Sequence, residues 1–304
     1  MRNIQLKNIG GLLVVLFMNV IAFAQLDTKQ YIPPVHARSA SGSHYLVLGT
    51  PIATTFNVSV TDGYGNLIAT IPISNGASST SLIGTNYNSP FLVTESQLNT
   101  PYYGGKGLIL TAPEPFYASI RVLVTNQAGS LTSKGESASL GKDFRIGHMY
   151  NNAGASSVKS SSFSIMATED NTNIAISDIH AGVVLRGVAA NTTNLNITLN
   201  AGQSYVVSTY MDQAGSSNNA NGLNGTHVTS DKNIAINCAS WLGGNSINGT
   251  SPSGSADTGK DIGIDQIVPI DVIGDEYVLI KGFGIDNERT VIIASEDNTE
   301  LFIN

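Results

Sequence analysis

The sequence is poor in charged residues and in cysteine. Charged side chains make up 12% of the 304 residues, about half of the roughly 25% that is usual. With 15 basic and 22 acidic residues and a formal net charge of −7, the chain has no basic surface to follow a phosphate backbone, which excludes nucleic acid as a partner. The single cysteine, Cys238, excludes an internal disulfide framework. We expect Cys238 to be a small buried hydrophobic residue.

Long apolar runs are missing except at the N-terminus. Residues 11–24 are uncharged and mostly apolar, follow the basic residues Arg2 and Lys7, and end in a small-x-small sequence. This pattern predicts a secretory signal peptide over residues 1–24, because about 14 apolar residues are fewer than the ~20 that cross a bilayer as a helix. We therefore expect a secreted or cell-surface protein whose mature chain has no transmembrane segment.

Motifs for metal binding and for nucleophilic catalysis are also missing. The five histidines are His36, His44, His148, His180 and His227. None of them is paired at metal-ligand spacing, so solvent or turn positions are expected for them. No Gly-x-Ser-x-Gly elbow is present. These absences predict a protein that is not an enzyme and that needs no cofactor.

The chain does contain alternating apolar and polar residues with a period of two. Phe163, Ile165 and Ala167, for example, are separated by single residues, of which one is polar. Apolar runs of five to eight residues bounded by Gly, Asn and Asp predict β-strands, and no helix is expected after residue 25. The predicted fold is all-β, with tandem antiparallel β-sandwich-like repeats. A propeller-like arrangement of short β-sheets is the alternative.

Two blocks of sequence recur along the chain. Residues 163–177 read FSIMATEDNTNIAIS and residues 290–304 read TVIIASEDNTELFIN, and a weaker copy begins at Phe56. We expect each copy to form a hairpin. A second block recurs at residues 107–122 and 225–240, and a turn is expected between the two apolar halves of each copy, at residues 112–115 and 230–233.

The recurrence divides the chain into a signal peptide, an extended lead-in, two complete β-repeat units and the start of a third. The predicted boundaries are 1–24, 25–41, 42–140, 141–275 and 276–304. Since the sequence stops within the expected third hairpin, we expect it to be the N-terminal fragment of a longer protein.

Three motifs carry a resemblance to a known family. They read ATEDNTNIAI at residues 167–176, ITLNAGQSYVV at 197–207 and GTHVTSDKNIAI at 225–236. The chain resembles the IgGFc-binding protein N-terminal domain family over residues 42–304, most strongly from Phe144 onward, and looks like its bacterial secreted or surface members. The resemblance implies extracellular binding or adhesion without naming a ligand, because the shared positions are those of turns and strands.

The acidic loops of the first block are the sharpest polar features of the sequence. Their carboxylate and amide oxygens are ligand types for Ca²⁺. The weak Ca²⁺ candidates are Glu169, Asp170, Asn171, Glu296, Asp297 and Asn298. A simple backbone turn is the favoured interpretation, because Asp and Asn accept unusual backbone angles and bond their own amides. The same two interpretations apply to Asp143 and Asp261.

Several aromatic residues stand beside glycines, where an exposed ring could stack on a sugar. These residues are Tyr64, Tyr102, Tyr103, Tyr210 and Trp241. For Trp241, which ends an apolar stretch, a core or rim position is favoured over a sugar platform.

Together these observations predict a non-catalytic extracellular or cell-surface binding or adhesion module at the N-terminus of a larger secreted protein. The expected partner is an extracellular protein or a glycan. Two alternatives stay open: a carbohydrate-binding accessory region of a secreted enzyme, and a structural spacer.

Overall fold

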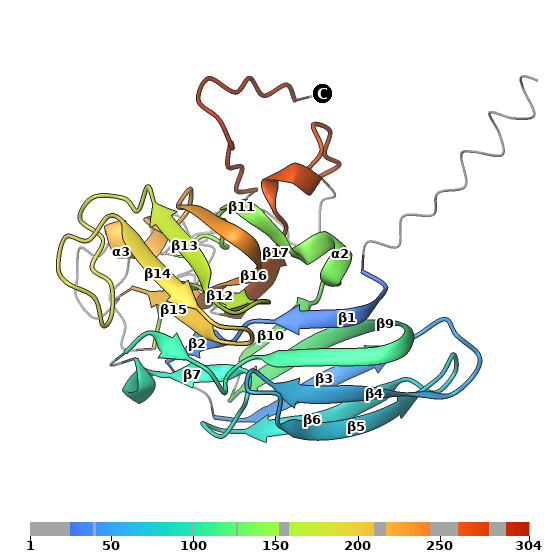
Figure 1. Ribbon diagram of the computed structural model, residues 1–304. Coiled ribbons are helices and arrows are strands. Elements are labelled where there is room, and N and C mark those ends of the chain that lie inside the picture. The colour runs from blue at the N-terminus through green and yellow to red at the C-terminus, as the bar shows by residue number, and fades with distance from the viewer. Residues whose placement is uncertain are drawn as a thin grey trace, which may run out of the picture.

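The structure is a computed structural model that describes residues 25–38, 41–98, 100–125, 127–151, 158–209, 217–243, 261–279 and 290–303 (Figure 1). The predicted signal peptide and Tyr210 lie outside the described residues. The described strands form two curled antiparallel sheets of seven and eight strands, and one separate parallel pair. The prediction of an all-β, sandwich-like antiparallel fold is confirmed.

The first sheet is built around one long central strand. Its strands are β1 (Asp27–Ile32), β3 (Ser43–Gly49), β4 (Phe56–Asp62), β5 (Leu67–Ile73), β6 (Ser79–Thr85), β9 (Leu108–Val124) and β10 (Gln127–Thr132). The strand order is β5-β4-β9-β3-β6, and β1 and β10 also pair with β9. β9 is 17 residues long and therefore joins all parts of the sheet.

The second sheet has a central strand of the same length. Its strands are β8 (Tyr102–Tyr103), β11 (Gly141–Arg145), β12 (Ser160–Ala167), β13 (Thr172–Ser177), β14 (Leu195–Leu199), β15 (Ser204–Ser208), β16 (His227–Gly243) and β17 (Asp261–Ile267). The order is β14-β13-β16-β12-β15-β8, with β11 and β17 also on β16. The remaining elements are β2 (Val35–Ala37), β7 (Leu92–Thr94), η2 (Glu95–Gln97), α2 (Glu136–Ser139), α3 (Ser217–Asn221) and η3 (Ile270–Val272).

The two sheets share one connectivity. β9 pairs with β1, β3, β4 and β10, and β16 pairs with β11, β12, β13 and β17. β5 pairs with β4 and β6 with β3, as β14 pairs with β13 and β15 with β12. In both sheets these strands follow the same order along the chain, and the long strand comes sixth of the seven.

The turns expected inside the second recurring block do not form. β9 and β16 run on through residues 112–115 and 231–233 as bent strands. The register of β1 jumps from Thr111 to Phe116, and β13 pairs only as far as Ser230 while β12 begins at Ile234. The residues between them are bulges, which bend a strand without reversing it. Each long strand therefore changes its partners at the bend.

The expected hairpin at residues 163–177 is also wrong, because β12 and β13 do not pair with each other. Ala167 of β12 and Gly141 of β11 both pair with Ile234, so β12 and β11 lie on opposite edges of β16. β13 also lies opposite β11, since both pair with residues 227–229. β12 and β13 consequently follow one another along the same edge. By connectivity, β12 corresponds to β3 and β13 corresponds to β4. The weaker copy that begins at Phe56 therefore matches β12 with β4, one strand later than the connectivity gives.

Two large hydrophobic cores account for most of the buried apolar residues. One is internal to the second sheet and includes Phe163, Ile165 and Cys238. The other lies in the first sheet but is completed by Trp241 and Ile262 from the second. Trp241 is fully buried, so the core position favoured for it is confirmed. Cys238 is buried as predicted, and burial raises the pKa of its thiol to about 12.

The segment predicted as an extended lead-in contains β1 and β2 and connects the two sheets. β2 pairs in parallel with β7 and contacts β12, β15 and β16. Tyr31 packs against Met166, which explains why an apolar residue stands on the side of β12 that the alternation assigns to polar residues. Ser164 donates a hydrogen bond to the carbonyl of Pro34, and Gln266 donates one of 2.6 Å to the carbonyl of Tyr31.

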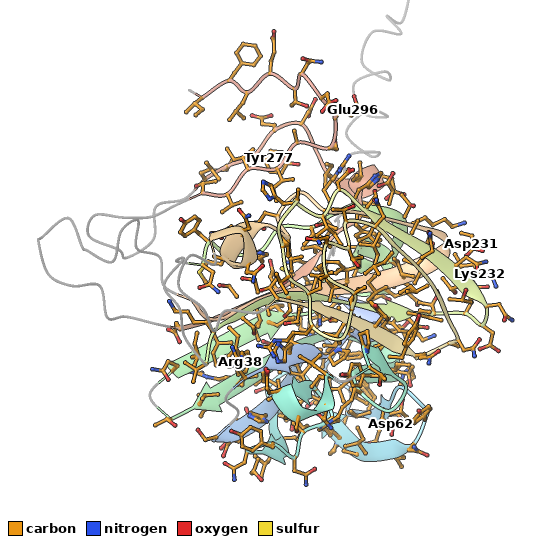
Figure 2. All side chains as sticks on the ribbon, turned by 90° about the vertical axis from the view of Figure 1, so that its left-hand side faces the viewer. Arg38, Asp62, Asp231, Lys232, Tyr277 and Glu296 are labelled. Atoms are coloured by element: carbon orange, nitrogen blue, oxygen red, sulfur yellow. The ribbon has the colours of Figure 1, made fainter. Side chains whose placement is uncertain are left out.

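The described parts of residues 276–304, which were predicted to begin a third unit, contain no strand. Their apolar side chains, among them Tyr277, Val278 and Phe302, are exposed, and Tyr277 and Glu296 lie above the sheets (Figure 2). A strand needs a partner for its backbone groups, and none of the described strands provides one here. The strands expected in this segment are therefore not seen.

Candidate functional site

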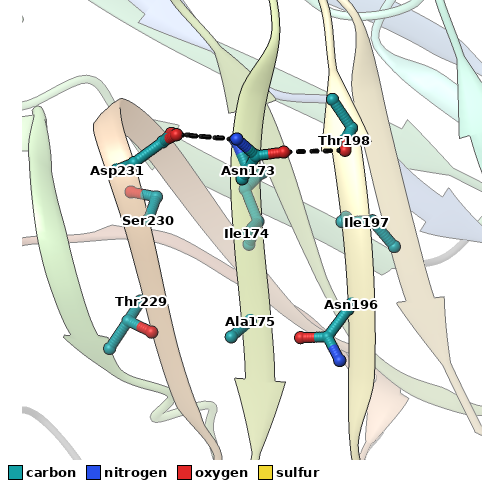
Figure 3. A pocket seen from close by; sticks show the side chains of 9 residues that line it. All are labelled: Asn173, Ile174, Ala175, Asn196, Ile197, Thr198, Thr229, Ser230 and Asp231. Atoms are coloured by element: carbon teal, nitrogen blue, oxygen red, sulfur yellow. Dashed lines mark hydrogen bonds between the residues drawn. The ribbon is translucent and has the colours of Figure 1, made fainter.

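A shallow depression of about 460 Å³ lies over β13, β14 and the first part of β16 (Figure 3). It is lined by Asn173, Ile174, Ala175, Asn196, Ile197, Thr198, Thr229, Ser230 and Asp231. Strand alternation turns Ile174 and Ile197 into the core and leaves the side chains of their neighbours outside. We call the outward-facing set Asn173, Ala175, Asn196, Thr198, Thr229 and Asp231 the polar shelf.

A chain of hydrogen bonds holds the polar shelf in one arrangement (Figure 3). Asp231 accepts two bonds from Asn173, one from its backbone N–H and one from its side-chain amide, both of 2.8 Å. The hydroxyl of Thr198 donates to the other side of the Asn173 amide at 3.0 Å. Asp231 lies in the bulge of β16, so its carboxylate replaces the ladder partner that the bulge removes.

The same hydrogen bonds set the charge of the shelf. The two bonds from Asn173 to the Asp231 carboxylate lower the pKa of Asp231 below its usual range, and nearby Lys232 acts in the same direction. Donors to the ionised form stabilise it. Asp231 is therefore a fixed hydrogen-bond acceptor with a negative charge at neutral pH.

Beyond the shelf, the sheet carries one histidine–carboxylate contact and one ion pair. His227 Nε2 lies 2.7 Å from the Asp143 carboxylate, and Arg145 Nη1 donates to Asp178 at 2.6 Å. Asp143 pairs with Thr229 in the ladder, so it extends the polar surface across β11. Asp261, the other repeated aspartate, instead accepts the backbone N–H of Ala128 at 2.7 Å.

The two acidic loops have the same local conformation. The hydroxyl of Thr172 donates to the Glu169 carbonyl and that of Thr299 to the Glu296 carbonyl, both at 2.8 Å. Asn171 has a positive φ of 53°, and the equivalent Asn298 has one of 59°. This is the backbone conformation that Asn tolerates in turns.

The carboxylate of Asp170 accepts the backbone N–H of Ala201 at 3.0 Å, and the amide of Asn200 accepts the N–H of Asn171 at 3.1 Å. In the part of the chain that the structure describes, no three His, Cys, Asp or Glu residues are grouped so that they could hold a metal ion. The Ca²⁺ assignment to the acidic loops stays a prediction.

The aromatic candidates lie in different surroundings. Tyr64, on the turn between β4 and β5, lies against Gly104 and Gly105, which follow β8. Tyr102 packs edge-on against Tyr205, with ring centroids 4.8 Å apart. Trp241 is in the core and cannot serve as a platform.

Three of the five histidines, for which solvent or turn positions were expected, are buried: His36, His44 and His148. That expectation is wrong for them, because spacing in the sequence carries no information about packing. His36 belongs to a polar cluster that has no sequence motif. Its Nδ1 lies 2.6 Å from the Ser208 hydroxyl and its Nε2 lies 3.3 Å from Glu95.

Glu95 also pairs with Arg38 and Arg186. Burial, followed by the charges of Arg186 and Arg38, lowers the pKa of His36 well below its usual range, so His36 is neutral. A serine, a histidine and a glutamate that contact one another in a row are typical of a nucleophile with its base. Here, however, Ser208 and His36 are buried. In this conformation a substrate has no access to the hydroxyl, and the cluster joins β2, η2 and β15.

The outer strand next to the shelf is open for pairing. Among the described residues, only β13 pairs with β14. β14 reads LNITL and has neither a charge nor a proline, which are two of the devices that protect a sheet edge. β5, an edge strand of the first sheet, carries Pro72.

The fold and this surface define a class of protein, a β-sheet module with an exposed, rigid polar face. Residues 128–304, more than half of the chain, match the model of the family described as IgGFc binding protein. The chain belongs to this family of extracellular binding modules, as its motifs predicted. The match begins later than the predicted resemblance, at β10.

No curated protein is a match for this sequence. No helix in the described ranges has the length and apolar character needed to cross a membrane.

Proposed function

We propose that this chain is an exported, non-catalytic binding module that holds an extracellular protein ligand on the polar shelf and along the free edge of β14. The observation that carries the proposal is the hydrogen-bonded row Asp231–Asn173–Thr198. Side chains fixed by one another lose little conformational freedom when a ligand binds. A surface of this kind supports recognition.

A protein is favoured as the ligand because the shelf borders an edge strand. An extended segment of a partner can add to such an edge through backbone hydrogen bonds. Its alternate side chains would then face Asn196 and Thr198 on the shelf, which supply amide and hydroxyl groups for specificity. The family description adds that the Fc region of immunoglobulin G is the first ligand to test.

Binding is favoured over catalysis by the chemistry of the shelf. Of the nine lining residues, Asp231 alone has an ionisable side chain, and its pKa is lowered. A general acid or base works best with a pKa near the working pH. Asp231 therefore suits the acceptance of hydrogen bonds rather than the transfer of protons.

The test is the binding of purified chain to immobilised human Fc fragment, measured by surface plasmon resonance. Replacing both Asn196 and Thr198 by Lys places charges on the β14 edge and the shelf, and we expect affinity to fall by at least about tenfold. The matched control is Thr80→Lys on β6, an exposed edge position of the other sheet. Equal binding by all three proteins would contradict a site on β14.

If the folded chain binds neither Fc nor any other extracellular protein tested, the spacer function becomes the better explanation. Attachment to a cell surface, and an accessory role beside a secreted enzyme, are extensions of the same proposal. They are tested by the location of the protein in fractionated cells and by the domains encoded beside it.

A further inference from the structure

The ring of Tyr64 lies flat on a pair of glycines. A Cβ atom added to Gly104 would overlap with ring atoms Cε1 and Cζ and with the hydroxyl of Tyr64, and one added to Gly105 would lie 3.0 Å from Cδ2 and Cε2. Atoms from both sides of the ring thus approach the two glycines, so one ring face covers the glycine backbone. Tyr64 is nevertheless 73% exposed, so its other face is open to solvent.

The backbone around Tyr64 is fixed from both sheets. Asp62 Oδ1 accepts the backbone N–H of Tyr64 and that of Asn66, both at 2.9 Å. Gly63 is in close contact with the backbone of Gly104 and with that of Gly202, which belongs to the second sheet. The exposed ring is therefore carried by a junction of three loops whose backbones are in close contact.

A carboxylate lies near the glycines that this ring covers, and it holds an amide. Asp62 Oδ2 lies on the Gly105 side of Tyr64, 3.9 Å from a Cβ built on that glycine. This oxygen accepts one bond, from the Asn66 amide at 3.0 Å, and a carboxylate oxygen can accept a second. A flat apolar face beside a carboxylate and an amide matches a molecule with one C–H face and hydroxyl groups around its rim.

We propose that Tyr64, Asp62 and Asn66 form a binding site for a pyranose ring of a neutral glycan, separate from the polar shelf. The C–H face of the sugar stacks on the outer face of Tyr64, and a sugar hydroxyl that reaches past the edge of the ring donates to Asp62 Oδ2 on the glycine side. A nucleic acid does not fit, because its phosphates would be repelled by Asp62 and by the net charge of −7. Anionic sugars are disfavoured for the same reason.

The test is the binding of the purified chain to an array of neutral hexasaccharides of glucose, galactose and mannose, followed by titration with the best of them. Tyr64→Ala is expected to weaken binding by about tenfold or more, because it removes the stacking face. Tyr64→Phe keeps that face and is expected to bind nearly as the parent does. The matched control is Tyr87→Ala, another exposed tyrosine of the first sheet.

Gly104→Ala is a second test variant, because the added methyl group displaces the Tyr64 ring without removing it. We expect a loss similar to that of Tyr64→Ala, with thermal unfolding confirming that each variant is folded. If Gly104→Ala does not fold, the proposal is tested by the difference in glycan affinity between Tyr64→Ala and Tyr64→Phe. The proposal is overturned if the parent binds no neutral hexasaccharide, or if Tyr64→Ala binds as the parent does. Fc binding by Tyr64→Ala stays unchanged in either case, which separates this site from the shelf.

Discussion

The side-chain amide of Asn237 donates a 2.6 Å hydrogen bond to the carbonyl of Pro33, 204 residues earlier in the chain. Asn237 lies in β16, the central strand of the second sheet, and it is fully buried. Pro33 lies between β1 and β2, in the segment that connects the sheets. A buried carbonyl needs a donor, so this contact ties the two sheets together.

We predict that Asn237→Ala lowers the free energy of unfolding by about 1 to 3 kcal/mol, because the Pro33 carbonyl is left buried without this donor. Urea unfolding followed by tryptophan fluorescence measures the change, since Trp241 is the sole tryptophan and lies in the shared core. The control is Asn173→Ala, which removes an amide from the exposed shelf and should lower the free energy of unfolding by a smaller amount. Equal midpoints for parent and Asn237→Ala would show that the contact is unimportant.

Acid should destabilise the protein before its carboxylates are protonated. Burial lowers the pKa of His148 from its ordinary 6.5 to about 4, so the unfolded chain binds the proton more readily than the folded one does. Above pH 6.5 the residue is neutral in both states and has no effect. Between pH 6.5 and 4 the stability falls, by about 3 kcal/mol in total.

Burial lowers the pKa values of His36 and His44 as well, and these histidines add to the loss in the same direction. Melting temperatures measured from pH 8 to pH 4 test this. His148→Gln should flatten the curve, whereas His180→Gln, at an exposed position, should not. A curve that is flat for the parent down to pH 4 would refute the burial of these rings.

Gly63 is expected to tolerate no side chain. A Cβ there would overlap with the carbonyl oxygens of Gly104 and Gly202, and backbone atoms cannot rotate away as a side chain can. We predict that Gly63→Ala lowers the free energy of unfolding by about 1 to 3 kcal/mol or more. Gly49→Ala is the control, because a Cβ at Gly49 meets nothing within 4 Å. Similar melting temperatures for both variants would mean that the three loops do not meet.

The acidic loops are expected to keep their shape without metal. The threonine hydroxyl and the positive φ of Asn171 already account for the turn at residues 169–172. We therefore predict no change in melting temperature when EDTA or millimolar Ca²⁺ is added. A rise of several degrees with Ca²⁺ would support binding instead, and loss of that rise in Asp170→Asn would place the ion at this loop.

The sequence allowed the fold class to be predicted because alternation reports directly on which side chains face a core. Phe163, Ile165 and Ala167 are buried in one core, as their spacing indicated. The burial of Cys238 followed from its apolar neighbours in the same way. These are local properties of single strands, which do not depend on the partner of each strand.

The partners themselves could not be predicted. Pro113 and Pro115 favoured a turn, since proline usually interrupts a sheet, yet both lie in the bulge of β9 where no ladder bond is needed. The loop at residues 169–172 has the composition of a hairpin turn, but its strands pair with β16 instead of with each other. Composition identifies a bend in the backbone without telling how far the chain turns.

The polar shelf could not be predicted because it also depends on strand pairing. Asn173 and Asp231 are 58 residues apart, and the expected turn at residues 230–233 gives no reason to place these two side chains next to each other. The sequence identifies Tyr64 as an aromatic residue beside glycines, but its contact with Gly104 depends on how two loops pack. A signal was available in the outward polar positions of β13 and β14, which alternation alone could have grouped on one face.

The place of the long strand in the chain has a consequence for how the molecule is made. β9 is synthesised after five of the strands in its sheet and β16 after six, and each of these earlier strands is linked to the long strand either directly or through other strands of the sheet. Until the ribosome has released this long strand, the earlier ones have no centre to assemble on. Such dependence on distant pairings slows folding, and it gives each half of the nascent polypeptide a long period in an unassembled state.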